Sequence, residues 1–370
     1  MKIAYFSNYK DLSGYSQAAL GYLQSLYSTG IKVAARNIYL QNLTHEEKAE
    51  INQYLPSEIK DMEQENLRGV DICIQHSLPN FTSPCEKAKN LLMFAVETSN
   101  FLSSDWPSYC NLYDNILTFS KFSAQSIKNS GVKSKIHILP HAVDINSAKN
   151  SKLVKMFNDD VCTFLFIGEW SVRKNVEGLL KGYYSEFRDE PVRLLMKTFV
   201  SGANAEQGES FIQKEVERIK KNCKLKKYPE VLIIVQRMTP FQINCLFKSS
   251  SYNICISRGE SFCLPIYEGL SFGLPVIVPD YGSFQEYIPK HKDKAGYHVP
   301  VIDDIVYGIN NGMDNMYTGT EHWFYPNLVE LKKIMRDLFN CWQNRNLDNS
   351  RYNSMSQNAK KLAEKFSFKT

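Results

Sequence analysis

Two glutamates eight residues apart are the strongest candidates for chemistry in this chain. Glu260 and Glu268 lie in the stretch 257–269, which reads S-R-G-E-S-F-C-L-P-I-Y-E-G. Pro265 suits the first turn of a helix, so the backbone N–H groups just before it would point at whatever the loop holds. These groups belong to Ser261, Phe262, Cys263 and Leu264. At helical rise the two carboxylates are separated by up to ~12 Å, well beyond the ~5 Å of a retaining glycosidase pair. The spacing therefore favours contacts to two ends of one extended ligand, a sugar and a ribose.

A pair of cations follows another predicted strand. Arg173 and Lys174 lie in the segment 168–175, G-E-W-S-V-R-K-N, between a strand-like run and a helix-like run. Cations at the carboxyl end of a strand are placed to neutralise a diphosphate, and Lys197, which ends the next strand, could join them. The chain contains no D-x-D triplet. We therefore expect these cations, and no dedicated metal site, to balance the charge of the ligand.

The first half of the chain offers weaker candidates. Gly14 and Tyr15 follow the first predicted strand and open a helix, where a glycine permits close backbone approach and the helix N-terminus offers N–H groups to a phosphate. The alternative is a glycine needed only for the turn. His76 follows the strand at 71–75 and could face an acceptor, although a structural hydrogen-bonding role is an equal alternative. The pattern lacks the G-x-G-x-x-G of a nicotinamide site.

These residues must be positioned by alternating strands and helices. Short apolar runs alternate with amphipathic runs, and strands apolar on both faces indicate parallel sheets covered on both sides. The predicted strands are 3–7, 32–37, 71–75, 90–96, 115–119, 135–139, 161–167, 192–197, 231–235, 252–256 and 275–278. The predicted helices are 15–27, 104–112, 121–130, 176–187, 209–222, 240–248, 265–272, 325–342 and 350–366, with 44–68 also helix-prone.

The pattern restarts after a polar, linker-like stretch at 144–160. We therefore predict an α/β protein of two facing Rossmann-like domains with a cleft between them, where such folds bind ligands. The expected units are a first domain at 1–147, a second at 148–345, and a final helix at 346–370 that packs back towards the first domain.

Composition narrows the class of protein. The chain has 370 residues, of which 43% are hydrophobic and 22% charged, as in folded globular proteins. Its net charge of +5 arises entirely after residue 150, which suits an anionic small ligand, and we expect no nucleic-acid partner. Nine cysteines without a C-x-x-C pair favour free thiols, and no apolar run could span a membrane. We expect a cytoplasmic protein, with peripheral contact to a membrane surface as a further expectation.

A family resemblance rests on these motifs. The stretch S-R-G-E-S-F-C-L-P-I-Y-E-G-L-S-F-G-L-P-V-I resembles the donor signature of retaining glycosyltransferase family 4, glycosyl transferases group 1, which has the GT-B fold. The resemblance extends to segments 13–15, 97–98, 140–144, 173–175 and 323–336 and so covers nearly the whole chain.

The resemblance implies a role for each matching residue. Glu260 would contact hydroxyl groups of the donor sugar and Glu268 the nucleotide ribose. Arg173 and Lys174 would stabilise the leaving diphosphate, which Gly14 would approach from the first domain. Departures from the family pattern are Ser261 and Cys263, where glycine is usual, Glu169, where arginine is common, and Gly269, where alanine is common.

The implied activity is that of a metal-independent retaining hexosyltransferase without a cofactor. It would move a hexose from a UDP- or GDP-sugar to a hydroxyl of a glycan or of a lipid-linked or protein-linked sugar, with the donor on the second domain and the acceptor on the first. Two alternatives remain. One is a non-catalytic GT-B module that binds a nucleotide or glycan, which the Ser261 and Cys263 departures favour. The other is a sugar-nucleotide epimerase or a phosphorylase on a related scaffold.

Overall fold

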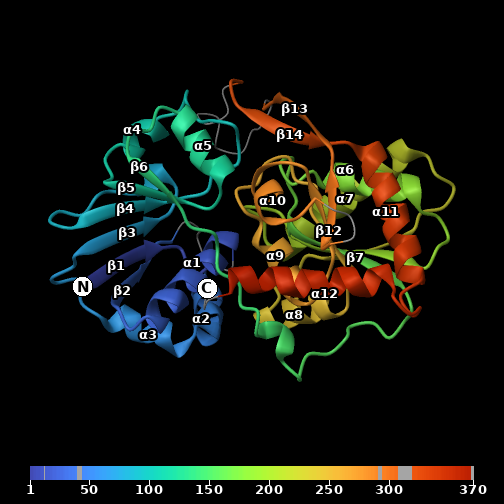
Figure 1. The fold of residues 1–370 in the computed structure, drawn as a ribbon, viewed down its shortest axis with the longest axis horizontal. Helices are drawn as coiled ribbons and strands as arrows, with labels where there is room; N and C mark the ends of the chain where they lie inside the picture. The colour runs from blue at the N-terminus through green and yellow to red at the C-terminus, as the bar shows by residue number, and fades with distance from the viewer. Residues whose placement is uncertain (12, 40–43, 291–293, 307–318, 368–370) are drawn as a thin grey trace.

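The computed structural model describes residues 1–11, 13–39, 44–290, 294–306 and 319–367. Two six-stranded parallel sheets, one in each half, lie side by side in Figure 1. The first has the order β2-β1-β3-β4-β5-β6, with β1 Lys2–Ser7, β2 Lys32–Asn37, β3 Ile72–His76, β4 Lys89–Met93, β5 Asn115–Thr118 and β6 Lys135–Ile138. The second has the order β12-β11-β10-β7-β8-β9, with β7 Cys162–Glu169, β8 Val192–Phe199, β9 Glu230–Ile234, β10 Tyr252–Ile254, β11 Val276–Pro279 and β12 Gly296–Val299.

Helices connect these strands, as the sequence predicts. In the first half they are α1 Gly14–Ser28, α2 His45–Tyr54, α3 Ser57–Gln64, α4 Trp106–Cys110 and α5 Lys121–Asn129. In the second half they are α6 Val176–Glu186, α7 Ala205–Cys223, α8 Pro240–Lys248, α9 Leu264–Ser271, α10 Gly282–Tyr287, α11 Leu328–Gln343 and α12 Arg351–Ala363. Short 3₁₀ turns lie at Pro79–Phe81, Ser147–Lys149 and Glu364–Phe366, and an antiparallel hairpin joins β13 Val301–Ile305 to β14 His322–Pro326. The predicted pair of facing Rossmann-like units is confirmed.

Each sheet reverses its direction of winding at one point. β1 lies between β2 and β3, and β7 lies between β8 and β10, so the loops that leave these neighbours diverge. Open α/β sheets bind ligands at such points, outside the carboxyl ends of the strands. Gly14 follows β1 and His76 ends β3, whereas Arg173 and Lys174 follow β7 and Glu260 follows β10. The topology therefore places these sequence candidates at the two positions where open α/β sheets generally bind ligands.

The predicted start of the helix at 325 is wrong. Tyr325 and Pro326 end strand β14, and helix α11 starts only at Leu328, after Asn327 has capped it by accepting hydrogen bonds from Val329 and Glu330 N–H groups. The aromatic residues before the cap resembled a helical stripe but pair with β13 instead. The elements α10, β12 and β13 were not predicted, because they are four to six residues long and too short to show a period.

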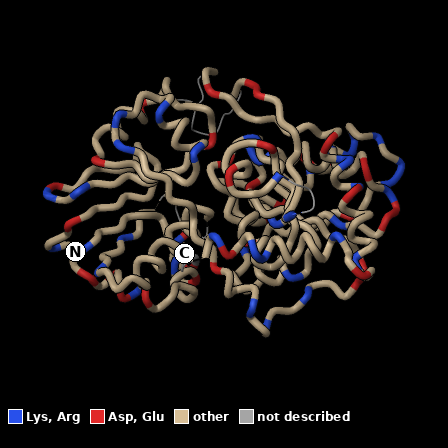
Figure 2. Tube along the Cα trace, viewed as in Figure 1, with Lys and Arg blue, Asp and Glu red and all other residues tan. Residues whose placement is uncertain are grey.

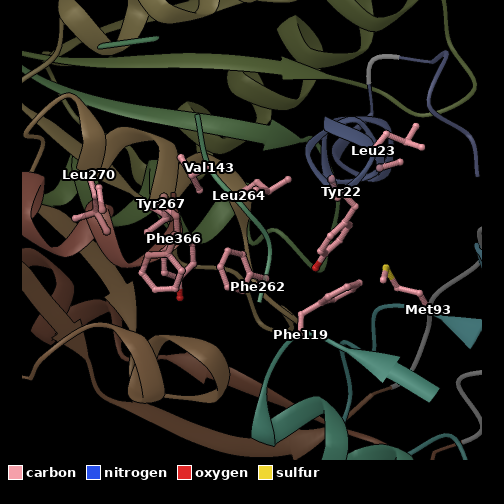
Figure 3. Close-up of a cluster of buried hydrophobic side chains, with 14 of the residues drawn as sticks. Tyr22, Leu23, Met93, Phe119, Val143, Phe262, Leu264, Tyr267, Leu270 and Phe366 are labelled. Atoms are coloured by element: carbon pink, nitrogen blue, oxygen red, sulfur yellow. The ribbon is translucent and has the colours of Figure 1, made fainter. Parts of the chain in front are cut away.

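One hydrophobic core is shared by both halves. Phe262 follows β10 in the second half, yet its ring centroid lies 5.0 Å from that of His141 and 5.8 Å from that of Phe366. The His141 ring in turn lies 3.9 Å from Phe119 at the end of β5. Figure 3 shows Tyr22 on α1 and Phe119 in the same buried cluster as Phe262, Tyr267 and Phe366 of the second half. Apolar contact thus fixes the two halves relative to each other.

The last helix links the second half to the linker. α12 packs against α9, and the chain then reaches the start of the linker, where the Val143 N–H donates to the Phe366 carbonyl at 2.6 Å. Figure 1 shows α12 running across the second half towards the first half. The ring of Phe366 is buried against Tyr267 and Tyr287.

Charged residues are distributed over both halves of the molecule. Figure 2 shows Lys and Arg mixed with Asp and Glu around both halves in this view, without a single broad basic face. Within the described part of the chain, no helix has the length and apolar character needed to cross a membrane.

The shared core predicts the effect of removing one ring. Phe366→Ala should lower the free energy of unfolding by about 3 kcal/mol, because a buried aromatic side chain leaves a cavity. Urea denaturation followed by tryptophan fluorescence measures this change. Phe211→Ala on α7 is the matched control, since that ring is 45% exposed. Equal stabilities of the two variants would contradict the packing role of Phe366.

Candidate functional site

Three predicted residues meet at the carboxyl edge of the second sheet. The Lys174 Nζ atom lies 2.5 Å from Oε1 of Glu260, and Nη1 of Arg173 lies 3.4 Å from the same oxygen. Glu260 is only 4% exposed, whereas the two cations keep part of their surface open. The structure therefore brings together Arg173, Lys174 and Glu260 from two loops that lie 86 residues apart in the chain.

Backbone contacts hold these two loops in register. The Arg258 N–H donates to the Arg173 carbonyl at 2.7 Å, and the Arg173 guanidinium donates back to the Gly259 carbonyl at 2.8 Å. Ser257 adds a hydroxyl hydrogen bond to the Arg173 carbonyl at 3.0 Å. The cations are thus fixed before any ligand arrives, which is the condition for electrostatic stabilisation without reorganisation.

Both members of the central ion pair are charged. Burial acts to lower the pKa of Lys174, but the Glu260 carboxylate, together with Cys263 and Cys255, raises that pKa overall. Burial likewise works to raise the pKa of Glu260, and the Lys174 and Arg173 cations overcome it and lower that pKa. These three groups alone carry one net positive charge, and the Glu97 carboxylate that also contacts Arg173 balances it.

A carboxylate of the first half completes this cluster. Glu97 follows β4, and its Oε2 lies 2.9 Å from Nε of Arg173. The backbones also touch, since a Cβ added at Gly259 would lie 2.1 Å from the Glu97 carbonyl oxygen. The sequence did not predict this contact, although Glu97 is an acidic residue directly after the apolar run 91–96, at the carboxyl end of a strand.

The loop before α9 contains Ser261 and Cys263, where the family pattern usually has glycine. Cys263 is the N-cap of α9 with a φ of 72°, a left-handed conformation that favours glycine. Ser261 forms a hydroxyl hydrogen bond of 2.8 Å to Ser123, which lies on α5 of the first half. The ring of Phe262 belongs to the shared core. Any contact of Ser261, Phe262, Cys263 or the buried Leu264 with a donor would therefore be made by the backbone N–H group.

Two thiols and a carboxylate lie together under this loop. Ligand atoms of Cys255, Cys263 and Glu260 are all within 4.8 Å of one another, a donor set of the type that binds soft metal ions. The Lys174 ammonium competes for the same carboxylate at 2.5 Å and would repel a cation. No metal site was expected from the sequence, and the arrangement of charges favours an anion here.

Glu268 lies on α9, apart from the cation cluster. Burial, followed by repulsion from Asp144, raises the pKa of Glu268 to about 7. The side chain is half-buried, and Asp144 comes from the linker. The sequence placed Asp144 in the linker but did not indicate that it faces Glu268. A carboxylate that titrates near neutrality makes any hydrogen bond that it accepts dependent on pH.

Gly14 and Tyr15 open α1 on the first side. Ser13 caps the helix by accepting from the Ser16 N–H at 3.2 Å, and Gly14 is exposed with no described atom within 4 Å of an added Cβ. Packing therefore does not require this glycine. The Tyr15 hydroxyl accepts a hydrogen bond from the Ala95 N–H at 3.0 Å, two residues before Glu97.

His76 and Lys197 lie away from the cluster. His76 is completely buried, its Nδ1 is hydrogen-bonded to the Tyr5 hydroxyl at 2.8 Å, and burial lowers its pKa to about 3. The rings of Tyr15 and Tyr22 pack on it, an environment that favours the structural alternative over contact with an acceptor. Lys197 donates to the Thr198 carbonyl at 3.4 Å instead of reaching Glu260, and burial lowers its pKa.

Comparisons with known proteins agree with this geometry. Residues 149–316, slightly less than half of the chain, match the family described as Glycosyl transferases group 1. The matched segment contains Arg173, Lys174, Glu260 and Glu268. No curated protein sequence is similar enough to this chain to count as a match.

Solved structures share the fold at low sequence identity. HepE (Alr3699) from Anabaena, solved with UDP and glucose, is 14% identical with a TM-score of 0.64, covering 100% of this chain and 96% of that one. Sucrose-phosphate synthase from Thermosynechococcus elongatus is 13% identical with a TM-score of 0.63 and the same coverage. A glycosyltransferase from Rickettsia africae is 15% identical with a TM-score of 0.61, covering 100% and 94%. The expected GT-B architecture is confirmed.

Two glycines of the site should respond differently to a methyl group. Gly259→Ala forces a Cβ against the Glu97 carbonyl oxygen and should lower the free energy of unfolding by about 2 kcal/mol. Gly14→Ala, at an exposed helix start with open space, should change it by less than about 0.5 kcal/mol. Urea denaturation measures both, and small-angle scattering should show expansion only for Gly259→Ala. A stable, equally compact Gly259→Ala protein would argue against the tight contact.

The raised pKa of Glu268 predicts a pH-dependent stability. Between about pH 4.5 and 7 the folded protein keeps a proton that the unfolded chain releases, so stability is lost as pH rises through this window. Glu268→Gln should therefore raise Tm at pH 8 by about 2 °C and leave it unchanged at pH 4.5. Differential scanning fluorimetry measures this difference. Glu86→Gln, an exposed control, should show no gain at either pH; a gain at both pH values for Glu268→Gln would refute the titration.

Proposed function

We propose that this protein is a retaining glycosyltransferase that moves a hexose from a nucleotide diphosphate sugar to a hydroxyl acceptor without a metal ion. The observation that carries this proposal is the fixed cation pair, Arg173 and Lys174, held by the buried Glu260 at the switch point of the second sheet. The family match over residues 149–316 spans the same elements.

The proposed reaction needs stabilisation of a leaving diphosphate. Breaking the sugar–phosphate bond develops negative charge on that group, and pre-oriented cations lower the energy of the transition state. Arg173 and Lys174 supply this charge from a rigid loop. Glu260 would orient the sugar through its hydroxyl groups, and the start of α9 would add backbone N–H groups near the phosphates.

The nucleotide would extend from this cluster along α9. Glu268, the predicted ribose contact, accepts hydrogen bonds from hydroxyl groups best as an ionised carboxylate. Because its pKa is about 7, the ionised form is the minor one in acid. A UDP-type donor is favoured because HepE, a structural neighbour, was solved with UDP and glucose. A GDP-type donor remains the second candidate for the base.

The acceptor would bind on the side of the first domain, residues 1–147, opposite the donor domain, residues 148–345. Gly14 and Tyr15 open α1 in the first domain, from where Gly14 would approach the donor diphosphate, and Glu97 of the same domain contacts Arg173. We propose attack on the same face of the sugar as the leaving group, with a donor phosphate oxygen taking the proton of the acceptor hydroxyl. The configuration of the sugar is then retained.

A non-catalytic nucleotide-binding module is the second candidate. The specific observation in its favour is that the Ser261 hydroxyl is engaged by Ser123 of the other half, at 2.8 Å, in a loop that would have to admit a sugar. Such a module would bind a nucleoside diphosphate as tightly as a transferase but would not hydrolyse or transfer the sugar.

Removal of the two cations tests the proposal. Arg173→Gln with Lys174→Gln keeps hydrogen-bond donors for Glu260 but removes both charges, and should reduce turnover at least about 100-fold. Turnover is measured as release of UDP or GDP from the nucleotide sugar whose addition raises Tm most. Lys181→Gln with Arg218→Gln removes two exposed cations of the same domain as a control. Near-normal turnover of the Arg173 and Lys174 variant would eliminate the proposed role, and wild-type binding without UDP or GDP release would favour the non-catalytic module.

A further inference from the structure

Glu97, a carboxylate of the first half, contacts Arg173, which is the residue that the proposed function assigns to the donor diphosphate. We propose that Glu97 is a positioning residue: it holds Arg173 across the cleft while the site is empty, and it yields this contact to the donor diphosphate by taking up a proton from solvent. The inference rests on the proposed function, because it takes the diphosphate to bind at Arg173 and Lys174.

The contact is close and comes from both sides of the cleft. Oε2 of Glu97 lies 2.9 Å from Nε of Arg173, and the exposed fractions of the two side chains are 30% and 19%. The Glu97 backbone cannot retreat easily, since its carbonyl oxygen abuts Gly259 in the donor loop. When the domains are closed, Glu97 therefore stays beside any ligand that binds Arg173.

The groups around Glu97 come from four elements. The cations are Arg173 and Lys174 after β7, the carboxylates are Glu260 after β10 and Glu169 at the end of β7, and the hydroxyl of Tyr15 on α1 faces the same region. Arg173 and Lys174 thus contact two carboxylates, and Glu169 lies near enough to repel Glu97. Burial raises the pKa of Glu97, and repulsion from Glu260 and Glu169 adds to this, whereas Arg173 and Lys174 oppose it.

A diphosphate at the cations changes this balance. The phosphates bring at least two negative charges and occupy the donors of Arg173 and Lys174, which are the groups that keep Glu97 ionised. Once the phosphates also contact those cations, the ionised form of Glu97 is less stabilised, and the lowest free energy is reached when Glu97 takes up a proton. As a neutral acid it can donate a hydrogen bond to a phosphate oxygen from the acceptor side, so closure of the domains and donor binding become compatible.

A purely structural salt bridge would behave differently. If Glu97 only braced Arg173, loss of its charge would leave the guanidinium less well oriented, and nucleotide binding would weaken at every pH. If Glu97 is displaced by the diphosphate, loss of its charge removes a competitor, and binding tightens with a change in the number of protons exchanged.

The test is calorimetry of UDP binding to the full chain at pH 7.5 in two buffers of different protonation enthalpy. At this pH free UDP is almost fully ionised, so the proton count reports the protein. Wild type should take up about one proton more per UDP than Glu97→Gln, and Glu97→Gln should bind UDP about tenfold more tightly. The difference between the two proteins is the readout, because Glu268 contributes equally to both.

Controls separate this inference from the proposed function. Glu97→Asp keeps the charge and should keep the proton uptake, and Asp105→Asn removes an exposed charge of the same domain and should match wild type. If Glu97→Gln unfolds at a lower temperature than wild type, Glu97→Ala serves instead and should take up the number of protons that is expected for Glu97→Gln. Weaker UDP binding by Glu97→Gln with unchanged proton uptake would overturn the inference alone. Failure of wild type to bind UDP, GDP, ADP and inorganic pyrophosphate would overturn the proposed function, and this inference with it.

Discussion

The ammonium of Lys174 and the carboxylate of Glu260 lie 2.5 Å apart at the carboxyl edge of the second sheet, and the arrangement of the site follows from this ion pair. Removing two charges from water is costly, so the pair persists only because neighbouring groups complete its contacts. Arg173 supplies a second cation, and hydrogen bonds from the Arg258 N–H and the Ser257 hydroxyl to its carbonyl lock the two loops together. The result is a rigid pair of cations in a poorly solvated place, where electrostatic contacts to an anion are strong.

The shared core holds the first half in a fixed position opposite this rigid site. Phe262 lies two residues after Glu260, and its ring packs on His141 and Phe366, so this loop is packed against the junction of the two halves. The same packing brings Glu97 within 2.9 Å of Arg173. Under the proposed function, these few contacts would couple donor binding to closure of the two halves and to the charge of Glu97.

Sequence reasoning predicted the fold well because its strands are short apolar runs with clear boundaries, and topology alone brings Arg173, Lys174 and Glu260 to one edge. It could not predict contacts that depend on how the halves close. Glu97 meets Arg173, and Asp144 faces Glu268, only in the assembled pair of domains. The hairpin β13–β14 also escaped prediction, because its exposed strand Val301–Ile305 carries two aspartates and no apolar period.

The central claim is that a nucleoside diphosphate binds at the second-sheet switch point through Arg173 and Lys174. A crystal structure of the protein soaked with UDP tests it most directly. The account predicts β-phosphate oxygens within hydrogen-bond distance, about 2.7–3.2 Å, of both cations, with the ribose hydroxyls at Glu268. A nucleotide bound at the first sheet, or one whose diphosphate touches neither Arg173 nor Lys174, would contradict it.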